Sequence, residues 1–178
     1  VAPDGYLTIS SSFTFKLAEG KVDADSITGV TDGEVEVSDD GKIIVKDKKS
    51  SITVSKRDLN AATDTKVSAT FKLSAETSGV TLDGVKAGTA TAGTDGTITF
   101  EGADTVIEGL KDGTYKLSEI AADGNYVTVS EFTFVIEAGK LKAQTTISET
   151  NGDVEFDAAT GTITVKDARK IEISKKEL

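Results

Sequence analysis

The sequence contains no Cys, His, Met or Trp, and Pro3 is its only proline. Without cysteine and histidine the chain cannot form disulfides, thiolate or imidazole metal sites, or histidine-dependent catalytic triads. Most enzyme classes are thereby excluded. We expect no cofactor and no metal.

Basic residues are also scarce, since 20 Lys and Arg stand against 30 Asp and Glu, giving a formal charge of −10. An acidic chain does not favour polyanions, so we expect no nucleic-acid partner and no anionic membrane surface as partner. No apolar run approaches the roughly 20 residues of a membrane span. The chain begins at Val1 without a signal peptide, which suggests a soluble piece of a longer protein.

What the sequence does contain is alternation. Of its 178 residues 37% are hydrophobic, and apolar and polar residues alternate over short runs, which is typical of half-buried antiparallel strands. Helical periodicity is nearly absent, with one weak segment at 57–63. The clearest alternating runs are 52–55, 67–73, 97–100, 115–118, 132–134 and 163–166, and Asp-Gly turn signals stand at 32, 40, 83, 95, 112 and 123. This pattern predicts an all-β sandwich.

The sequence also repeats itself. The Ala-Pro-Asp-Gly at 2–5 returns as Ala-Ala-Asp-Gly at 121–124, 119 residues later, and Phe-Thr-Phe at 13–15 returns at 132–134. Gly-Lys-Ile-Ile-Val-Lys-Asp at 41–47 likewise matches Gly-Thr-Ile-Thr-Val-Lys-Asp at 161–167. A repeat of this length is a normal single-domain size.

We therefore expect a window on a tandem array. Residues 1–49 would be the C-terminal part of a preceding repeat, residues 50–168 a complete repeat, and residues 169–178 the first strand of a following one. The junctions are short and lack Gly and Pro, which favours a stiff rod over flexibly linked domains. Neighbouring repeats of the same polypeptide are the first expected partners.

Three strands of the complete repeat place an ionisable residue on the apolar face. Alternation puts Lys56 after Ile52 and Val54, Glu119 after Tyr115 and Leu117, and Asp167 after Ile163 and Val165. A lone buried charge costs several kcal/mol, so such residues are normally excluded, paired or neutralised. Two interpretations without further chemistry are open: each residue ends a strand and reaches water, or the lysine and a carboxylate form a buried ion pair.

Two of these positions recur in the neighbouring repeats, because Asp47 corresponds to Asp167 and Lys175 to Lys56. Recurrence favours a specific role. We predict a spontaneous isopeptide bond between the Lys56 amine and the Asp167 carboxyl group, with Glu119 as the catalytic proton shuttle. Burial favours the uncharged forms of both reactants, and the fold holds them together. Asp47 and Lys175 would be repeat equivalents without a complete site.

The residues also carry a family resemblance. The chain resembles the B-type repeat domains of Gram-positive collagen adhesins and sortase-assembled pilins across residues 50–168. The resemblance implies an immunoglobulin-like, transthyretin-like β-sandwich closed by an isopeptide bond, with Lys56 matching the lysine and Glu119 the catalytic acid. The family more often has Asn at the position of Asp167, so this chain would release water instead of ammonia. The matching segments are 52–58, 69–73, 109–119, 121–124, 132–134 and 165–167.

Two functions of different class follow. The first is a stalk or shaft segment of an extracellular adhesin or pilus at the cell wall or cell surface, not an enzyme, with head-to-tail subunits as further partners. The alternative is a module that binds a host protein or glycan through its loops. That alternative has little support, since the segment 75–96 is rich in Gly, Thr and Ala without an aromatic cluster.

Overall fold

The structure is a computed structural model that describes residues 3–7, 12–30, 34–129, 131–149, 151–171 and 173–176. All regular secondary structure in these ranges is β-strand. No helix long and apolar enough to cross a membrane occurs among them. The segment 57–63, which the sequence marked as weakly helical, is instead the end of a strand and a turn.

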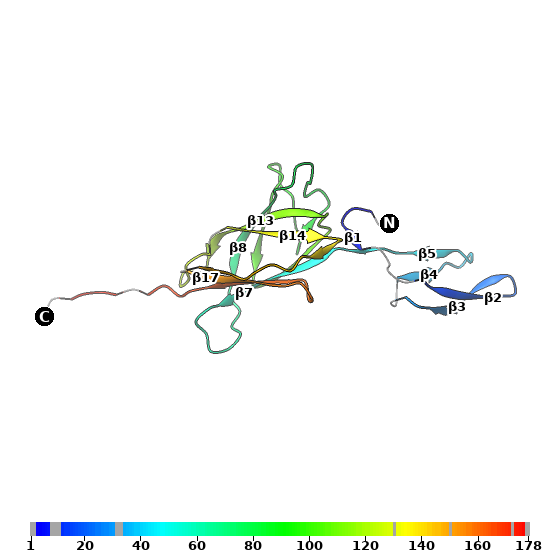
Figure 1. Ribbon diagram of the computed structural model, residues 1–178, viewed down its shortest axis with the longest axis horizontal. Coiled ribbons are helices and arrows are strands. Elements are labelled where there is room, and N and C mark those ends of the chain that lie inside the picture. Colours follow the sequence, from blue (N-terminus) through cyan, green and yellow to red (C-terminus); the bar gives the residue numbers. More distant parts are fainter. Residues whose placement is uncertain are drawn as a thin grey trace.

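The strands follow one another along the whole chain (Figure 1). In chain order they are β1 (Tyr6–Leu7), β2 (Thr14–Ala18), β3 (Lys21–Thr28), β4 (Val35–Val37), β5 (Ile43–Val45), β6 (Lys48–Lys49), β7 (Ser51–Asp58), β8 (Ala69–Ala75), β9 (Lys86–Ala87), β10 (Ala90–Thr91), β11 (Ile98–Gly102), β12 (Asp104–Glu108), β13 (Gly113–Ala122), β14 (Phe132–Glu137), β15 (Lys140–Leu141), β16 (Ile147–Glu149), β17 (Gly152–Asp157) and β18 (Thr162–Asp167).

Two sheets form the central body. The first has seven strands in the order β10-β9-β12-β7-β18-β17-β16, and the second has five in the order β11-β8-β13-β14-β15. Neighbouring strands are antiparallel with one exception: β18 runs parallel to β7, with Val165 beside Lys56. The expectation of antiparallel strands is wrong for this pair. β7 is the first strand of the body and β18 the last, so the chain that connects them is nearly the whole domain. A parallel pair needs a long connection, because a short hairpin can join only antiparallel strands.

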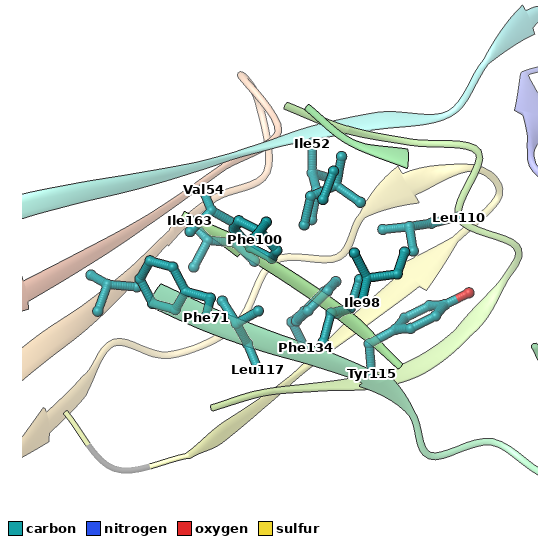
Figure 2. Close-up of a cluster of buried hydrophobic side chains, with 14 of the residues drawn as sticks. Ile52, Val54, Phe71, Ile98, Phe100, Leu110, Tyr115, Leu117, Phe134 and Ile163 are labelled. Atoms are coloured by element: carbon teal, nitrogen blue, oxygen red, sulfur yellow. The ribbon is translucent and has the colours of Figure 1, made fainter. Parts of the chain in front are cut away.

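A single apolar layer lies between these sheets. Figure 2 shows Ile52, Val54 and Ile163 of the larger sheet pointing at aromatic and aliphatic side chains of the smaller one. The rings of Tyr115 and Phe134 stack there with centroids 5.5 Å apart. Strand β18 alternates strictly between half-buried and buried residues. The predicted all-β sandwich is therefore confirmed. The side chains that fill its core are those that the alternation places on the inner face of each strand.

The turns use the expected Asp-Gly chemistry. At the turn before β11, Asp95 accepts a hydrogen bond from the Thr97 amide at 3.1 Å, and Gly96 takes the left-handed backbone at φ 72°. The segment 75–96 is not a bare loop, since it contains the short hairpin β9–β10, which extends the larger sheet through β12. Its apolar residues Leu82 and Val85 are buried in the core.

Outside this body the chain forms separate two-stranded ribbons, β2–β3 and β4–β5, which project to one side (Figure 1). On the opposite side the chain leaves the body after Asp167, and residues 171 and 173–176 belong to no strand. The strand predicted around Lys175 is therefore not formed among the described residues.

The junction before the body is tied down by backbone contacts. β1 pairs with β6, and the Ser50 amide donates to the Gly5 carbonyl at 2.9 Å. The Gly109 amide in turn donates to the Ser50 carbonyl at 2.8 Å. A Cβ on Gly5 would lie 2.7 Å from the Gly109 carbonyl oxygen, so the two backbones meet at van der Waals contact. The first junction is thus a packed contact and not a flexible linker.

Candidate functional site

The site begins with a lysine inside the sandwich. Lys56 lies on the buried face of β7, after Ile52 and Val54, and its side chain is fully shielded from solvent. Asp167, at the end of β18, is equally buried on the adjacent parallel strand. The register sets Val165 beside Lys56, so Asp167 stands two residues further along the same face. Lys56 Nζ lies 2.7 Å from Asp167 Oδ1 and 3.5 Å from the Val165 carbonyl oxygen.

The third member comes from the opposite sheet. Glu119 lies near the end of β13, where the pairing with β8 slips between Glu119 and Ala121. Its side chain points inward, with Oε1 3.8 Å from Lys56 Nζ. The other oxygen, Oε2, accepts a hydrogen bond of 3.0 Å from the backbone amide of Val129. The three groups therefore lie between the two sheets, near the ends of the strands that carry them.

Burial dominates the electrostatics of Glu119. Removal from water raises its pKa, and the nearby Asp167 carboxyl group raises it further, whereas Lys56 and the Val129 amide lower it in part. The net effect raises the pKa of Glu119 to about 8. Glu119 therefore holds a proton at neutral pH.

The oxygens of the cluster are poorly satisfied. Glu119 Oε1 and both carboxylate oxygens of Asp167 have no hydrogen-bond partner among the described residues. Lys56 Nζ approaches Asp167 Oδ1 closely, but outside hydrogen-bond geometry. Buried ionic groups are normally stabilised by several hydrogen bonds, so an ion pair held in this way is a poor stabilising element.

The structure brings together the three residues that alternation singled out. Because all three side chains are buried, the interpretation as solvent-exposed strand ends is wrong. The repeat equivalents behave differently. Asp47 is half-buried after β5 and Lys175 is exposed, and neither makes an ion pair with another described residue. No cluster of acidic residues able to hold a metal ion occurs in the described part of the chain.

Sequence reasoning missed a second buried acid. The Asp58 side chain is fully buried at the end of β7, and it accepts hydrogen bonds from Arg169 Nε at 2.7 Å and from the Tyr126 hydroxyl at 3.1 Å. Burial alone would raise the pKa of Asp58, but the bonds from Arg169, the Asn60 amide and Tyr126 outweigh it and lower the pKa. The signal was present, since Asp58 continues the inward phase of Ile52, Val54 and Lys56.

This second cluster has no amine beside the carboxylate. A guanidinium stays protonated and is a poor nucleophile, so Asp58 and Arg169 form a clasp without further chemistry. The clasp fixes the chain where it leaves β18, because the Arg169 amide also donates to Asn60 Oδ1 at 3.0 Å.

Fold and site together define a prealbumin-like β-sandwich domain with a buried Lys, Glu and Asp cluster between its two sheets. A family profile described as "SpaA: Prealbumin-like fold domain" matches residues 50–151, which is more than half of the chain. The chain belongs to this family. No curated protein matches it.

The solved structures that the chain matches include several pilus proteins. The pilus adhesin SpaC of Lactobacillus rhamnosus GG is 19% identical with a TM-score of 0.41, and the match covers 94% of this chain and 23% of that one. The pilus adhesin RrgA of Streptococcus pneumoniae is 19% identical with a TM-score of 0.44, covering 72% and 16%. The group B streptococcus pilus 2b backbone protein is 20% identical with a TM-score of 0.37, covering 80% and 47%. This chain thus spans less than half of each.

Proposed function

We propose that residues 50–168 are a load-bearing domain of an extracellular Gram-positive pilus or surface adhesin, locked by an isopeptide bond between Lys56 and Asp167. The observation that carries the proposal is the buried cluster, in which amine and carboxyl group lie 2.7 Å apart beside a carboxylic acid with a pKa of about 8. Membership of the SpaA family supports the assignment, and so does the B-type resemblance of the sequence.

The chemistry needs no cofactor. The Lys56 ammonium transfers a proton to the Asp167 carboxylate, whose Oδ1 is 2.7 Å away, and the neutral Nζ then attacks Cγ of Asp167 to form a C–N bond. Protonated Glu119 donates a hydrogen bond to the Asp167 carboxyl oxygen, which makes Cγ more electrophilic. The nitrogen then loses its second proton, a C–O bond of the carboxyl group breaks, and Glu119 passes protons so that the leaving oxygen departs as water. The products are one amide and one water, and Glu119 is unchanged.

The fold supplies the driving arrangement. Two groups held in reactive contact act as an intramolecular pair, for which effective molarities of about 10⁵ M or more are known. The reaction occurs once per domain, so the protein is not an enzyme.

The bond would carry mechanical force. Tension enters the domain at Ser51, the start of β7, and leaves it after Asp167, the end of β18. A covalent link between Lys56 and Asp167 carries this load directly from one strand to the other. The roughly 110 residues between them are then bypassed, and the domain cannot extend unless a covalent bond breaks. This property suits a stalk or shaft whose neighbouring repeats, and subunits placed head to tail, share one line of force.

A mass measurement tests the proposal. The folded chain should be lighter than its sequence mass by one water, and Glu119→Ala should restore the full mass in a folded protein. Lys56→Arg should also abolish the link, because a guanidinium is a poor nucleophile. Asp167→Asn should lose ammonia in place of water, which identifies the carbonyl partner. An unmodified mass in a well-folded wild-type chain would contradict the mechanism.

The alternative, a ligand-binding adhesion module, predicts a different result. A screen against glycans and host matrix proteins should then show saturable binding that is independent of the mass loss. The stalk function predicts no such binding by residues 50–168.

A further inference from the structure

The catalytic acid of the proposed reaction depends on a segment that belongs to no strand. Val129 lies between β13 and β14, and its backbone amide donates the 3.0 Å bond to Glu119 Oε2. The side chain of Val129 is only 2% exposed. The segment is attached to the exit of β18 through the Val127 amide, which donates to the Ala168 carbonyl at 3.0 Å. Its position near Glu119 is therefore set by packing, since no sheet ladder holds Val129.

Val129 packs against a glycine. Gly152, the first residue of β17, is buried and stands directly opposite Asp167 in the β17–β18 ladder. A Cβ at this position would lie 2.7 Å from Val129 Cγ2 and 1.9 Å from the Lys166 carbonyl oxygen. The backbone of Gly152 lies outside the left-handed region, so its requirement for glycine comes from space and not from conformation.

We propose that the contact between Val129 and Gly152 positions Glu119 for isopeptide formation. The proposal rests on the proposed function of the Lys56, Glu119 and Asp167 cluster. The missing side chain at Gly152 lets Val129 close over the core, which brings its amide within reach of Oε2. Val129 and Gly152 are positioning residues, because they act through Glu119 and do not touch the amine.

The contact assigns different roles to the two oxygens of Glu119. Oε2 accepts the Val129 amide and is fixed as the acceptor. Oε1 is the oxygen nearest to Lys56 Nζ and is free of any hydrogen bond within the described residues, so it is the one that carries the proton. Without the amide the carboxyl group could rotate, and the acidic proton would no longer be directed at Asp167.

The titratable groups that face Glu119 among the described residues are Lys56 of β7 and Asp167 of β18. The segment that contains Val129 presents a backbone amide to it and no charge. Because that amide lowers the pKa of Glu119 from the still higher value that burial would give, its loss raises the pKa. The pH dependence of the reaction is therefore a readout that a purely structural role of the segment would not change.

The experiment starts from full-length chain kept unfolded and unreacted in denaturant, which is then diluted into buffers from acid to alkaline pH. Intact mass over time gives the rate of water loss, and circular dichroism reports folding. Val129→Pro removes the amide, Val129→Gly keeps the amide but removes the packing side chain, and Gly152→Ala fills the space. Gly124→Ala is the matched control, since a Cβ there meets nothing within 4 Å.

We expect Val129→Pro, Val129→Gly and Gly152→Ala to slow water loss at least about tenfold, as misplaced catalytic groups do, and Gly124→Ala to react at the wild-type rate. In Val129→Pro the alkaline decline of the rate should also move to higher pH. If Gly152→Ala does not fold, the two Val129 variants alone test the positioning role.

Wild-type rates in both Val129 variants, or an unmoved alkaline decline in Val129→Pro, would overturn the positioning role while leaving the isopeptide bond intact. A wild-type chain that folds and never loses water would refute the proposed function itself.

Discussion

Two regions of the molecule carry the same sequence pattern and bury it very differently. Phe134 and Val165 in the sandwich are 0% exposed, whereas their repeat equivalents Phe15 and Val45 in the N-terminal ribbons are 43% and 52% exposed. The strands form in both regions, and β4–β5 has the same antiparallel pairing as β17–β18. Among the described residues, only those of the sandwich have a second sheet facing them.

This difference shows that strand formation and burial of the apolar face have separate requirements. Alternation and a turn suffice for a two-stranded ribbon, but burial of the apolar face needs a facing layer. The same holds for the chemistry. Asp167 shares a buried cluster with an amine from β7 and an acid from β13, whereas Asp47 follows β5, which pairs only with β4 among the described residues. The site is thus a property of three strands together and not of the Val-Lys-Asp sequence.

The largest expected effect comes from removing the proposed covalent link, which would lie in the sandwich alone. Glu119→Ala should lower the free energy of unfolding by about 5 kcal/mol, the value that the chain-entropy model gives for a cross-link enclosing about 110 residues. Denaturant unfolding followed by fluorescence or circular dichroism measures it. The control is Glu36→Ala in the N-terminal ribbon, whose ion pair with Lys46 is about half exposed and should contribute less than about 1 kcal/mol. Equal effects would show that no cross-link is present.

The next largest effect tests the core. Phe134→Ala should destabilise the chain by about 3–5 kcal/mol, because it removes a fully buried ring and its stacking contact with Tyr115. Phe15→Ala, the same change at the equivalent position of the ribbon, should stay within about 0.5 kcal/mol. Measurement in the Glu119→Ala background keeps the transition reversible and comparable. A large effect of Phe15→Ala would mean that the ribbon is packed in solution.

A smaller effect concerns the clasp at the exit of the sandwich. The pKa of Asp58 is lowered in the fold, so its contribution to stability is present above its unfolded pKa and is lost as the pH falls through the lowered value. Arg169→Ala should reduce the melting temperature at neutral pH by less than Phe134→Ala does, and should flatten the acid side of the stability profile. Thermal melts from pH 2 to 7 measure both. An unchanged acid limb would show that Asp58 titrates independently of Arg169.

The parts of this fold that alternation encodes could be predicted from the sequence. Period 2 sets which side chains face the core, and for that reason Lys56, Glu119 and Asp167 stood out as ionisable residues on apolar faces. The parallel pairing of β7 and β18 was not predictable, because alternation is the same for both strand directions. The short hairpin β9–β10 lies in a segment whose Gly and Thr content hid its buried residues.

The supporting shell of the site left almost no trace in the sequence. Every residue carries a backbone amide, so nothing marks the one at Val129 that meets Glu119. Nothing in the sequence marks the packing role of Gly152, because Val129, which it contacts, lies in a segment outside the strand ladders. Asp58 was in the inward phase, but a partner located after β18 could not be assigned without the structure.

The smallest expected effect is at Asp47 and Lys175, the repeat equivalents of Asp167 and Lys56, and it tests directly whether the two regions differ in their chemistry. The ribbon β4–β5, which precedes Asp47, lies on one side of the sandwich, and the C-terminal segment that contains Lys175 lies on the other (Figure 1). We therefore expect no bond between these two residues within one molecule. We expect Asp47→Ala and Lys175→Ala to leave two quantities unchanged: the loss of one water relative to each variant's own sequence mass, and the melting temperature of the folded chain. Denaturing gel electrophoresis of the wild type should show a single monomer band. A covalent ladder that disappears in either variant would mean that the C-terminal segment of one molecule binds to the N-terminal ribbon of the next. In that case β5 would pair with a lysine-containing strand of another molecule.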